Sequence, residues 1–357
     1  MLNTPTPKKR NLIKLDRELR EFADSAGQKS LTPLSDGTLL LHRIQSARMY
    51  RVDLEKKTVD PYLTPFTHLS WMINLEDGRF LVRSGLKGDK NMQQRLMIWD
   101  DRSEELQTIR ENDPLLGLAM AYRFDERFYL WTYDNYVATS TGDTLGFERC
   151  NVNLFHRDRL DAPTKLLDYE KRETAAVFSE DPAIVFHCEW GRFGQHVFVV
   201  QYDVDDHGGL TERKREHCRL YLEDKPISPT VVGLDQDGHA IAYGHRSLNK
   251  PKGAILAWYQ SGLFRIDKET AEPSLIATYE GGHSKVIAGE GDRFYIFSHP
   301  NSMTLKRTTA VYRHAPETGF EKMGELSGEH KPYACIEHNG QLICLGEKNI
   351  FLVTLPN

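Results

Sequence analysis

The sequence lacks long apolar runs and has little cysteine. No stretch of the 357 residues reaches the roughly 20 apolar residues that a membrane-spanning helix needs. Residues 1–10 are followed by no apolar segment of the kind that a cleavable secretory signal contains. The chain has 5 cysteines, and none are spaced as a C-x-x-C pair. These absences predict buried free thiols in a reducing, cytoplasmic protein. Translocation by a route without a cleavable signal peptide stays open.

The short motifs that carry well-defined chemistry are also absent. There is no GxSxG elbow, phosphate-binding P-loop, GxGxxG or HExxH sequence. A net charge of -5 does not favour nucleic acid as a partner, because a dedicated nucleic-acid binder is expected to carry a strongly basic face. We therefore expect no cofactor, no metal and no membrane association. A Ser/His/Asp set is not excluded, since its members meet only in the fold.

One hairpin recurs along the whole chain. Each copy is an apolar strand, a tight turn with Asp or Gly, and a second apolar strand. The seven copies are Leu31–His42, Leu69–Arg83, Leu118–Thr132, Ile184–Gln201, Thr230–Gly244, Val286–Ser298 and Tyr333–Gly346. Repeats of about 40–50 residues are typical of the blades of a β-propeller. We therefore predict an all-β, seven-bladed β-propeller.

The two ends of the chain suggest how the ring closes. The last hairpin is followed by only one more strand, Asn349–Leu355, and the stretch Asn11–Phe22 precedes the first full blade. We predict that the N-terminal segment pairs within the C-terminal blade, which would remove two free sheet edges. A short amphipathic helix over Leu12–Phe22 is the alternative. The predicted domain is residues 11–357, after a flexible tail of residues 1–10.

The blade around residues 165–230 is the hardest to place. Asp203–His217 is highly charged and suggests an inserted loop, which leaves no clear outermost strand before Pro226. Histidines, cysteines and acidic residues gather in the same region. Their spacing does not match a zinc or calcium site, so we expect cross-strand packing, with His187 and His196 on opposite arms of one hairpin.

One blade carries part of a known repeat. Leu96–Asp100 (LMIWD) resembles the Trp-Asp strand ending of a WD40 repeat, and His68 lies upstream where that family has its entry histidine. Gly282-His283 resembles its Gly-His dipeptide more weakly. In that family a histidine, a hydroxyl, an aspartate and the tryptophan form a hydrogen-bonded staple. The resemblance implies that this staple is formed here by His68, Ser84, Asp89 and Trp99. It points to the propeller superfold and not to a specific family.

Charge placement suggests a binding face. The turns within each hairpin and between the third and fourth strands are rich in acids, whereas the loops between the second and third strands are rich in bases. Asp in turns also has a local explanation, since its side chain accepts backbone N–H bonds. We letter the four strands of each blade a to d, from the innermost to the outermost. The bases predict an electropositive face that steers an acidic partner, formed by the loops between strands b and c (b–c loops) and by the loops from strand d to the next blade (d–a loops). The predicted contact residues are Lys87, Lys90, Arg95, Arg213, Lys214, Arg215, Arg246, Lys250, Lys252 and Arg307, with Tyr133 and Tyr136 as aromatic anchors.

These features favour a non-catalytic scaffold that binds a protein partner through this face. The first alternative is a hydrolase or lyase with its site at the mouth of the central channel. Residues that precede innermost strands would reach that mouth: His68, Asp181, His283 and His330. The second alternative is a binder of an anionic ligand or nucleic acid on the basic face. The sequence leaves the identity of the partner and the oligomeric state open.

Overall fold

A computed structural model gives the structure of the chain. It describes residues 8–25, 29–43, 46, 48–75, 78–86, 88, 94–111, 120–124, 127–138, 145–156, 159–170, 174–181, 183–191, 194–204, 210–253, 258–289, 291, 293–299, 301, 308–327 and 332–354. Between residues 120 and 181 the description covers the backbone only.

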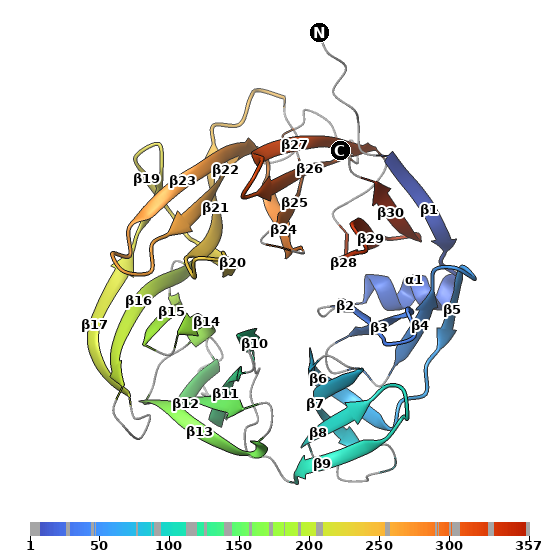
Figure 1. Ribbon diagram of the computed structural model, residues 1–357. Helices are drawn as coiled ribbons and strands as arrows, with labels where there is room; N and C mark the ends of the chain where they lie inside the picture. The colour runs from blue at the N-terminus through green and yellow to red at the C-terminus, as the bar shows by residue number, and fades with distance from the viewer. Residues whose placement is uncertain are drawn as a thin grey trace.

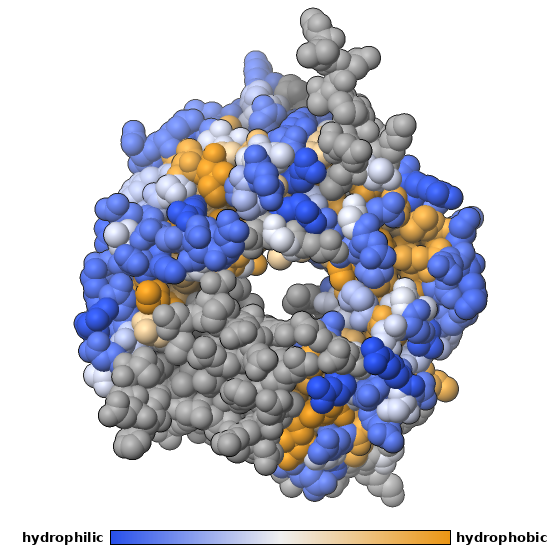
Figure 2. All heavy atoms as spheres, viewed as in Figure 1, coloured by the Kyte–Doolittle hydropathy of each residue, from blue (hydrophilic) through white to orange (hydrophobic). Residues whose placement is uncertain are grey.

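The strands form four-stranded antiparallel sheets that stand around a central axis (Figure 1), and the space-filling view shows an opening at the centre of the ring (Figure 2). The first two sheets are β2 (Lys29–Pro33), β3 (Leu39–Arg43), β4 (Met49–Asp53) and β5 (Thr58–Pro61), then β6 (Phe66–Asn74), β7 (Arg79–Leu86), β8 (Arg95–Asp100) and β9 (Leu106–Arg110). The next two are β10 (Met120–Phe124), β11 (Arg127–Ala138), β12 (Leu145–His156) and β13 (Arg159–Glu170), then β14 (Thr174–Asp181), β15 (Ile184–Gly191), β16 (Gly194–Val204) and β17 (Leu210–Cys218).

A two-stranded hairpin, β18 (Leu220–Leu222) and β19 (Lys225–Ile227), follows β17. Two further sheets are β20 (Thr230–Leu234), β21 (Ala240–Leu248), β22 (Trp258–Ile266) and β23 (Pro273–Glu280), then β24 (Gly282–Ala288), β25 (Phe294–His299), β26 (Thr308–Ala315) and β27 (Gly319–Ser327). The last sheet has the order β28 (Ala334–His338), β29 (Gln341–Leu345), β30 (Asn349–Thr354) and β1 (Lys8–Lys14). The first strand of each four-stranded sheet lies nearest the axis (Figure 1), and the predicted all-β propeller is confirmed.

The N-terminal segment contains both a strand and a helix. β1 pairs antiparallel with β30, from Lys8 opposite Thr354 to Lys14 opposite Asn349. It therefore includes residues 8–10, which the sequence placed in the tail. The helix α1 (Arg17–Asp24) follows, and its N-cap Asp16 accepts a hydrogen bond from the Leu19 amide at 2.8 Å.

Helix α1 packs where the last sheet meets the β2–β5 sheet. Leu19 and Phe22 are buried, and the Phe22 ring meets the Tyr50 ring edge-on with centroids 5.0 Å apart. These side chains share one apolar cluster with Leu31 of β2 and Ile350 of β30. Nowhere in the part of the chain described above is a helix long and apolar enough to cross a membrane.

The second half of the charged segment that the sequence assigned to an insertion, from Leu210 to His217, belongs to the outermost strand of its sheet. β17 pairs with β16 along its whole length, from Leu210 opposite Val204 to Cys218 opposite Val197. An outermost strand has one neighbour and tolerates charged side chains, which also discourage edge-to-edge association. That tolerance is why its sequence resembles a solvated loop.

Among the described residues, Trp99 does not take part in the hydrogen-bonded staple that the WD40 resemblance implies. Trp99 is fully buried, but its indole Nε1 has no hydrogen-bond partner there. The Ser84 hydroxyl donates to the Gly85 carbonyl at 3.2 Å, and Asp89 lies outside the described residues. Trp99 instead packs among apolar rings, including Phe66 with centroids 5.2 Å apart.

The acids of the turns serve local structure. At the ends of β8 and β22, Asp100 and Asp267 each accept two backbone N–H bonds from the turn that follows. These bonds hold the pKa of each carboxyl below its usual range. In the hairpin turns, Asp36 and Asp235 each accept backbone N–H bonds as well. The local explanation for acidic turns therefore covers these four positions.

Replacing Asp267 by Ala tests this explanation. The two N–H groups that it binds, of Glu269 and Thr270, would lose a charged acceptor. We expect Asp267→Ala to lower the free energy of unfolding by about 1–2 kcal/mol in denaturant titration. The control is Glu269→Ala, an exposed position two residues further along the same turn, which should change the free energy of unfolding by less than about 0.5 kcal/mol. Equal effects of the two variants would contradict the capping role.

Candidate functional site

Several predicted contact residues have no described side chain. Lys87, Lys90, Arg307 and His330 lie outside the described residues. The backbones of the others are placed, and they lie inside strands and not in the loops that the sequence suggested: Tyr133 and Tyr136 in β11, Asp181 at the end of β14 and His283 in β24. His68 also lies within an innermost strand, β6, with a φ of 55° where the pairing register shifts.

The basic residues with described side chains do not form one loop face. Arg213, Lys214 and Arg215 lie in β17, where each makes an ion pair, with Asp203, Glu216 and Glu212 respectively. Their assignment to a b–c loop is wrong because that segment continues the sheet. These acidic neighbours offset most of the positive charge that the sequence suggested.

Three predicted residues lie in or next to strands elsewhere. Arg95 begins β8 and is half-buried. Arg246 lies in β21, where it is paired with Glu223 and donates through Nε to Gln260 Oε1 at 2.9 Å. Lys250 and Lys252 are exposed in the connection after β21, which is a b–c loop as predicted.

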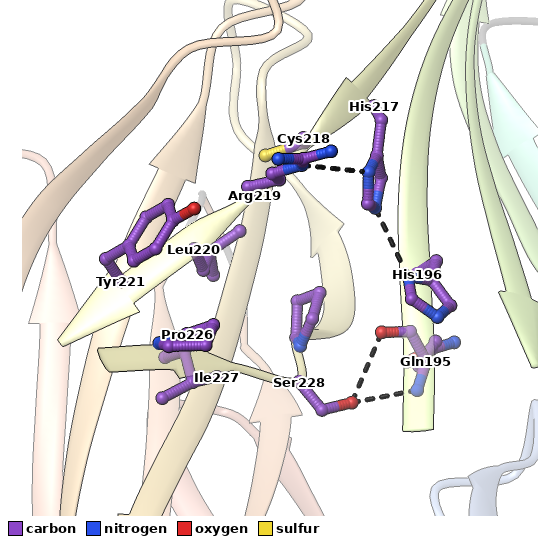
Figure 3. Close-up of a pocket in the computed structure, with 11 residues that line it drawn as sticks. Gln195, His196, His217, Cys218, Arg219, Leu220, Tyr221, Pro226, Ile227 and Ser228 are labelled. Carbon is purple, nitrogen blue, oxygen red and sulfur yellow. Dashed lines mark hydrogen bonds between the residues drawn. The ribbon is translucent and has the colours of Figure 1, made fainter. Parts of the chain in front are cut away.

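A pocket lies between the β14–β17 sheet and the hairpin that follows it (Figure 3). Its volume is about 470 Å³, within the usual range for small-molecule sites. The lining comes from the start of β16, the end of β17 and the connection to β20. The lining residues are Gln195, His196, His217, Cys218, Arg219, Leu220, Tyr221, Pro226, Ile227, Ser228 and Pro229. β16 is the third strand of its sheet and β17 is the fourth. The start of β16 and the end of β17 therefore lie on the side of the ring that carries the b–c and d–a loops.

The polar wall of the pocket is a chain of hydrogen bonds. Arg219 Nε donates to His217 Nδ1 at 3.4 Å, and His217 Nε2 lies 3.2 Å from His196 Nδ1 (Figure 3). An arginine can only donate, so His217 must accept through Nδ1. Neutral His217 then carries its proton on Nε2 and donates to His196, which leaves the Nε2–H of His196 as the terminal donor.

Packing fixes this chain in place. The His217 ring stacks on Phe198, its partner across the strands, with centroids 4.8 Å apart. At the opposite wall, the amide of Gln195 donates to Ser228 Oγ at 2.8 Å, and that hydroxyl donates back to the Gln195 carbonyl. These two bonds tie the connection before β20 to the start of β16, and so hold the pocket open between them.

The electrostatics of the pocket are one-sided. Two histidines and one arginine line it, and none of its lining residues with a described side chain is acidic. Desolvation, followed by the charges of His196 and Arg219, lowers the pKa of His217. Burial raises the pKa of the Cys218 thiol to about 12, so this thiol stays protonated and is not a nucleophile at neutral pH.

His187, a further titratable residue of this hairpin, is part of the packed interior and does not line the pocket. His187 and His196 lie on opposite arms of the hairpin, β15 and β16, as expected, but His187 is directly opposite Phe198 in the register. It is buried and lies within 3.3 Å of the Tyr202 hydroxyl. No group of three or more potential metal ligands occurs within the described segments of the chain.

Comparisons with known proteins identify the fold and no family. No protein family matches the sequence, and no curated protein matches it. A solved oligogalacturonate lyase from Vibrio parahaemolyticus is 12% identical with a TM-score of 0.58, over 99% of this chain and 98% of that one. The likeness is one of fold alone. An oligogalacturonate lyase in complex with manganese, 10% identical over 99% and 98%, has a TM-score of 0.51. A virginiamycin B lyase from Staphylococcus aureus with quinupristin is 11% identical with a TM-score of 0.50, over 98% of this chain and 100% of that one.

Sequence reasoning missed the pocket because no local signal marks it. His196 and His217 are 21 residues apart and meet only through the pairing of β16 with β17. Gln195 and Ser228 are 33 residues apart and meet through the fold of the β18–β19 connection. The one available signal was the density of histidine and cysteine near this hairpin, which was interpreted as packing.

Proposed function

We propose that this protein is a binding propeller that captures an anionic group, a carboxylate or a phosphate, in the pocket of His196, His217 and Arg219. The observation that carries the proposal is that His196, His217 and Arg219 line the pocket together, with no acidic side chain among the lining residues that the structure describes. A guanidinium offers paired donors that match the oxygens of either anion. The terminal Nε2–H of the histidine chain adds another donor.

The apolar half of the pocket supports a ligand with a nonpolar body. Leu220, Tyr221, Pro226 and Ile227 contribute apolar surface to the pocket lining (Figure 3). Leu220 is almost fully buried. Tyr221 is 49% exposed, which is high for a large aromatic residue. Exposed aromatics beside charged donors are typical of recognition surfaces. The anion is therefore proposed to be attached to an organic ligand or to a protein side chain.

The scaffold function expected from the sequence fits the same location. The pocket lies on the b–c and d–a side of the ring, and the exposed Lys250 and Lys252 follow β21 on that side of the neighbouring sheet. A partner protein with an acidic segment would engage both features. We further infer that the ring has seven blades and closes through β1 on β30, which gives this face a fixed geometry.

The enzyme alternative rests on the same histidines. The histidine chain ends in the Nε2–H of His196, which can donate a hydrogen bond to a reacting oxygen. Solved structures of similar fold include enzymes named as lyases, which shows that this architecture carries catalysis in other proteins. Turnover of a substrate would distinguish an enzyme from a protein that only binds its ligand.

Binding of inorganic phosphate and of citrate, measured by calorimetry, tests the proposal. We expect Arg219→Gln to weaken binding about 10–100-fold, because a charge-assisted pair of hydrogen bonds is lost. The matched control is Arg213→Gln, which removes the same charge from an exposed position on β17. We expect the control to bind as the wild type does.

The pH dependence gives a second measurement of the same site. Desolvation and the charge of Arg219 keep His217 neutral in the free protein, where its Nδ1 accepts from Arg219, and a bound anion would favour the protonated ring instead. Wild-type binding should therefore strengthen relative to that of His217→Gln as the pH falls through the range in which histidines titrate, at about 6.5. The comparison with the variant removes the titration of the anion itself. If the wild type binds neither anion at millimolar concentration, or if Arg219→Gln and Arg213→Gln bind alike, the anion site is refuted.

A further inference from the structure

Two cysteines face each other across the hairpin of β28 and β29, in the sheet that contains β1. Cys335 and Cys344 are direct partners in the strand register, and their Sγ atoms lie 2.8 Å apart. This is closer than two unbonded sulfur atoms normally approach. No other cysteine in the described strands has a cysteine as its direct partner: Cys188 and Cys218 both oppose Val197, one on each side of β16, and Cys150 of β12 opposes Tyr133 and Tyr169.

The hairpin geometry suits a covalent bond between these sulfurs. His338 pairs with Gln341 across the turn of Asn339 and Gly340, which have φ values of 52° and 70°. Two positive φ values are typical of a type I′ turn, in which the flanking pair is hydrogen-bonded. Pair types then alternate along the ladder, so Cys335 and Cys344 form a non-hydrogen-bonded pair. In such pairs the side chains lie closest, and the Cα separation of about 4.5 Å falls within the range of disulfides.

The surroundings distinguish the two thiols. Cys344 is fully buried in an apolar cluster with Phe351 and Tyr295, whereas Cys335 is only half-buried. A small oxidant therefore reaches Cys335 first. Next to this pair the Tyr333 amide donates to the Leu345 carbonyl at 2.8 Å, which holds the end of the hairpin together. Because the two sulfurs already lie 2.8 Å apart, a bond between them needs little movement of the strands.

We propose that Cys335 and Cys344 are a redox-active dithiol that forms a cross-strand disulfide with a low-molecular-weight disulfide such as oxidised glutathione. The Cys335 thiolate attacks the glutathione disulfide, forms a mixed disulfide and releases one glutathione thiolate. The Cys344 thiolate then attacks the Cys335 sulfur and releases the second. The two cysteines lose two electrons and two protons, and these convert oxidised glutathione to two molecules of reduced glutathione. This site is independent of the proposed anion pocket.

Equilibration of the full chain in glutathione buffers of defined ratio tests the proposal. Free thiols are then alkylated under denaturing conditions, and the peptides are mapped by mass spectrometry. In oxidising buffer we expect the wild type to lose two alkylatable thiols, with one disulfide joining the peptides of Cys335 and Cys344. Addition of a reductant should restore both, and the oxidised protein should melt at a higher temperature than the reduced one.

Single variants separate the two steps. Cys344→Ser removes the resolving thiol, so glutathione should stay attached to Cys335. Cys335→Ser should take up little glutathione, because Cys344 is buried. The proposal is overturned if wild-type Cys335 and Cys344 both remain alkylatable in fully oxidising buffer, or if the disulfide joins other cysteines. This readout on the wild type needs no variant to fold.

Discussion

Replacing Glu337 by Ala is expected to lower the free energy of unfolding by about 2–4 kcal/mol. Glu337 lies in β28, and its side chain is 4% exposed. Its Oε1 accepts from Arg293 Nη2 at 2.9 Å and from the Tyr295 hydroxyl at 3.0 Å, both from the neighbouring sheet. The carboxylate therefore joins two blades through one buried contact, with Tyr295, and one partly buried contact, with Arg293.

The magnitude follows from what the substitution leaves behind. Tyr295 is 1% exposed, and burial together with the charge of Glu337 raises the pKa of its phenol to about 12. Without Glu337 this hydroxyl would stay buried with its acceptor lost, and Arg293 would lose its carboxylate. An unsatisfied buried donor costs about 1–3 kcal/mol, and a broken partly buried ion pair adds to it.

Denaturant titration of three variants measures how much this contact between blades contributes to the free energy of unfolding. The control is Glu325→Ala, whose carboxylate pairs with Lys322 but is 45% exposed, and we expect a loss below about 1 kcal/mol. Tyr295→Phe should cost about 1 kcal/mol, because it removes one hydrogen bond and keeps the ring. Similar losses in Glu337→Ala and Glu325→Ala would show that the contact between blades contributes little.

The fold was predictable because its signals are local. Alternating apolar residues on either side of Asp36-Gly37, Asp237-Gly238 and Asn339-Gly340 indicated three hairpins, and the structure has β2–β3, β20–β21 and β28–β29 there. A tight turn and its flanking strands are specified within about a dozen residues. Repetition of this unit then indicated the propeller.

The outermost strand β17 escaped prediction for a physical reason. Its sequence, LTERKREHC, has almost no apolar residue, and its charged side chains pair with one another on the edge of the sheet. Strand formation there is imposed by the ladder of β16 and not by the propensity of the segment. The loop assignment of Arg213, Lys214 and Arg215 failed with it.

The pocket could not be predicted because it depends on register. A displacement of two residues across the β15–β16 hairpin decides whether His196 lies opposite His187 or opposite Glu189, and the structure has Glu189. The same pairing places His196 beside His217 on the next strand. Register of this kind is set by the whole sheet and by turn geometry, which the sequence around a single histidine does not reveal.

The two resulting proposals use different parts of the ring. The anion pocket depends on the β14–β17 sheet and the hairpin after it, whereas the dithiol lies in the sheet that includes β1 and β30. Blades of a propeller contact mainly their neighbours, so a change in one leaves distant ones intact. We therefore expect Cys344→Ser to retain anion binding and Arg219→Gln to retain the dithiol chemistry.

Lowering the pH from 6.5 to 4 is expected to destabilise the wild type by about 3 kcal/mol through His42 alone. This histidine lies in β3 and is 4% exposed, and burial lowers its pKa to about 4. Its Nε2 lies 3.4 Å from Thr32 Oγ1, and its Nδ1 has no hydrogen-bond partner among the described residues. The folded state therefore keeps the imidazole neutral, because little around it would stabilise the protonated, positively charged form.

The sign follows from proton binding. Above pH 6.5 the imidazole is neutral in both states, so its contribution is constant. Between 6.5 and about 4 the unfolded chain takes up a proton that the folded chain does not, and the free energy of unfolding falls. Below about 4 both states are protonated and the loss is complete.

Comparing the wild type with His42→Gln isolates this effect from the carboxylates that titrate in the same range. Gln is neutral at every pH and keeps a polar group near Thr32. We expect the difference in free energy of unfolding between the two proteins to shift by about 3 kcal/mol, in favour of the variant, as the pH falls from 7 to 4. Parallel pH profiles of the two proteins would mean that His42 gains its proton without cost in the folded state, and that burial does not set its pKa.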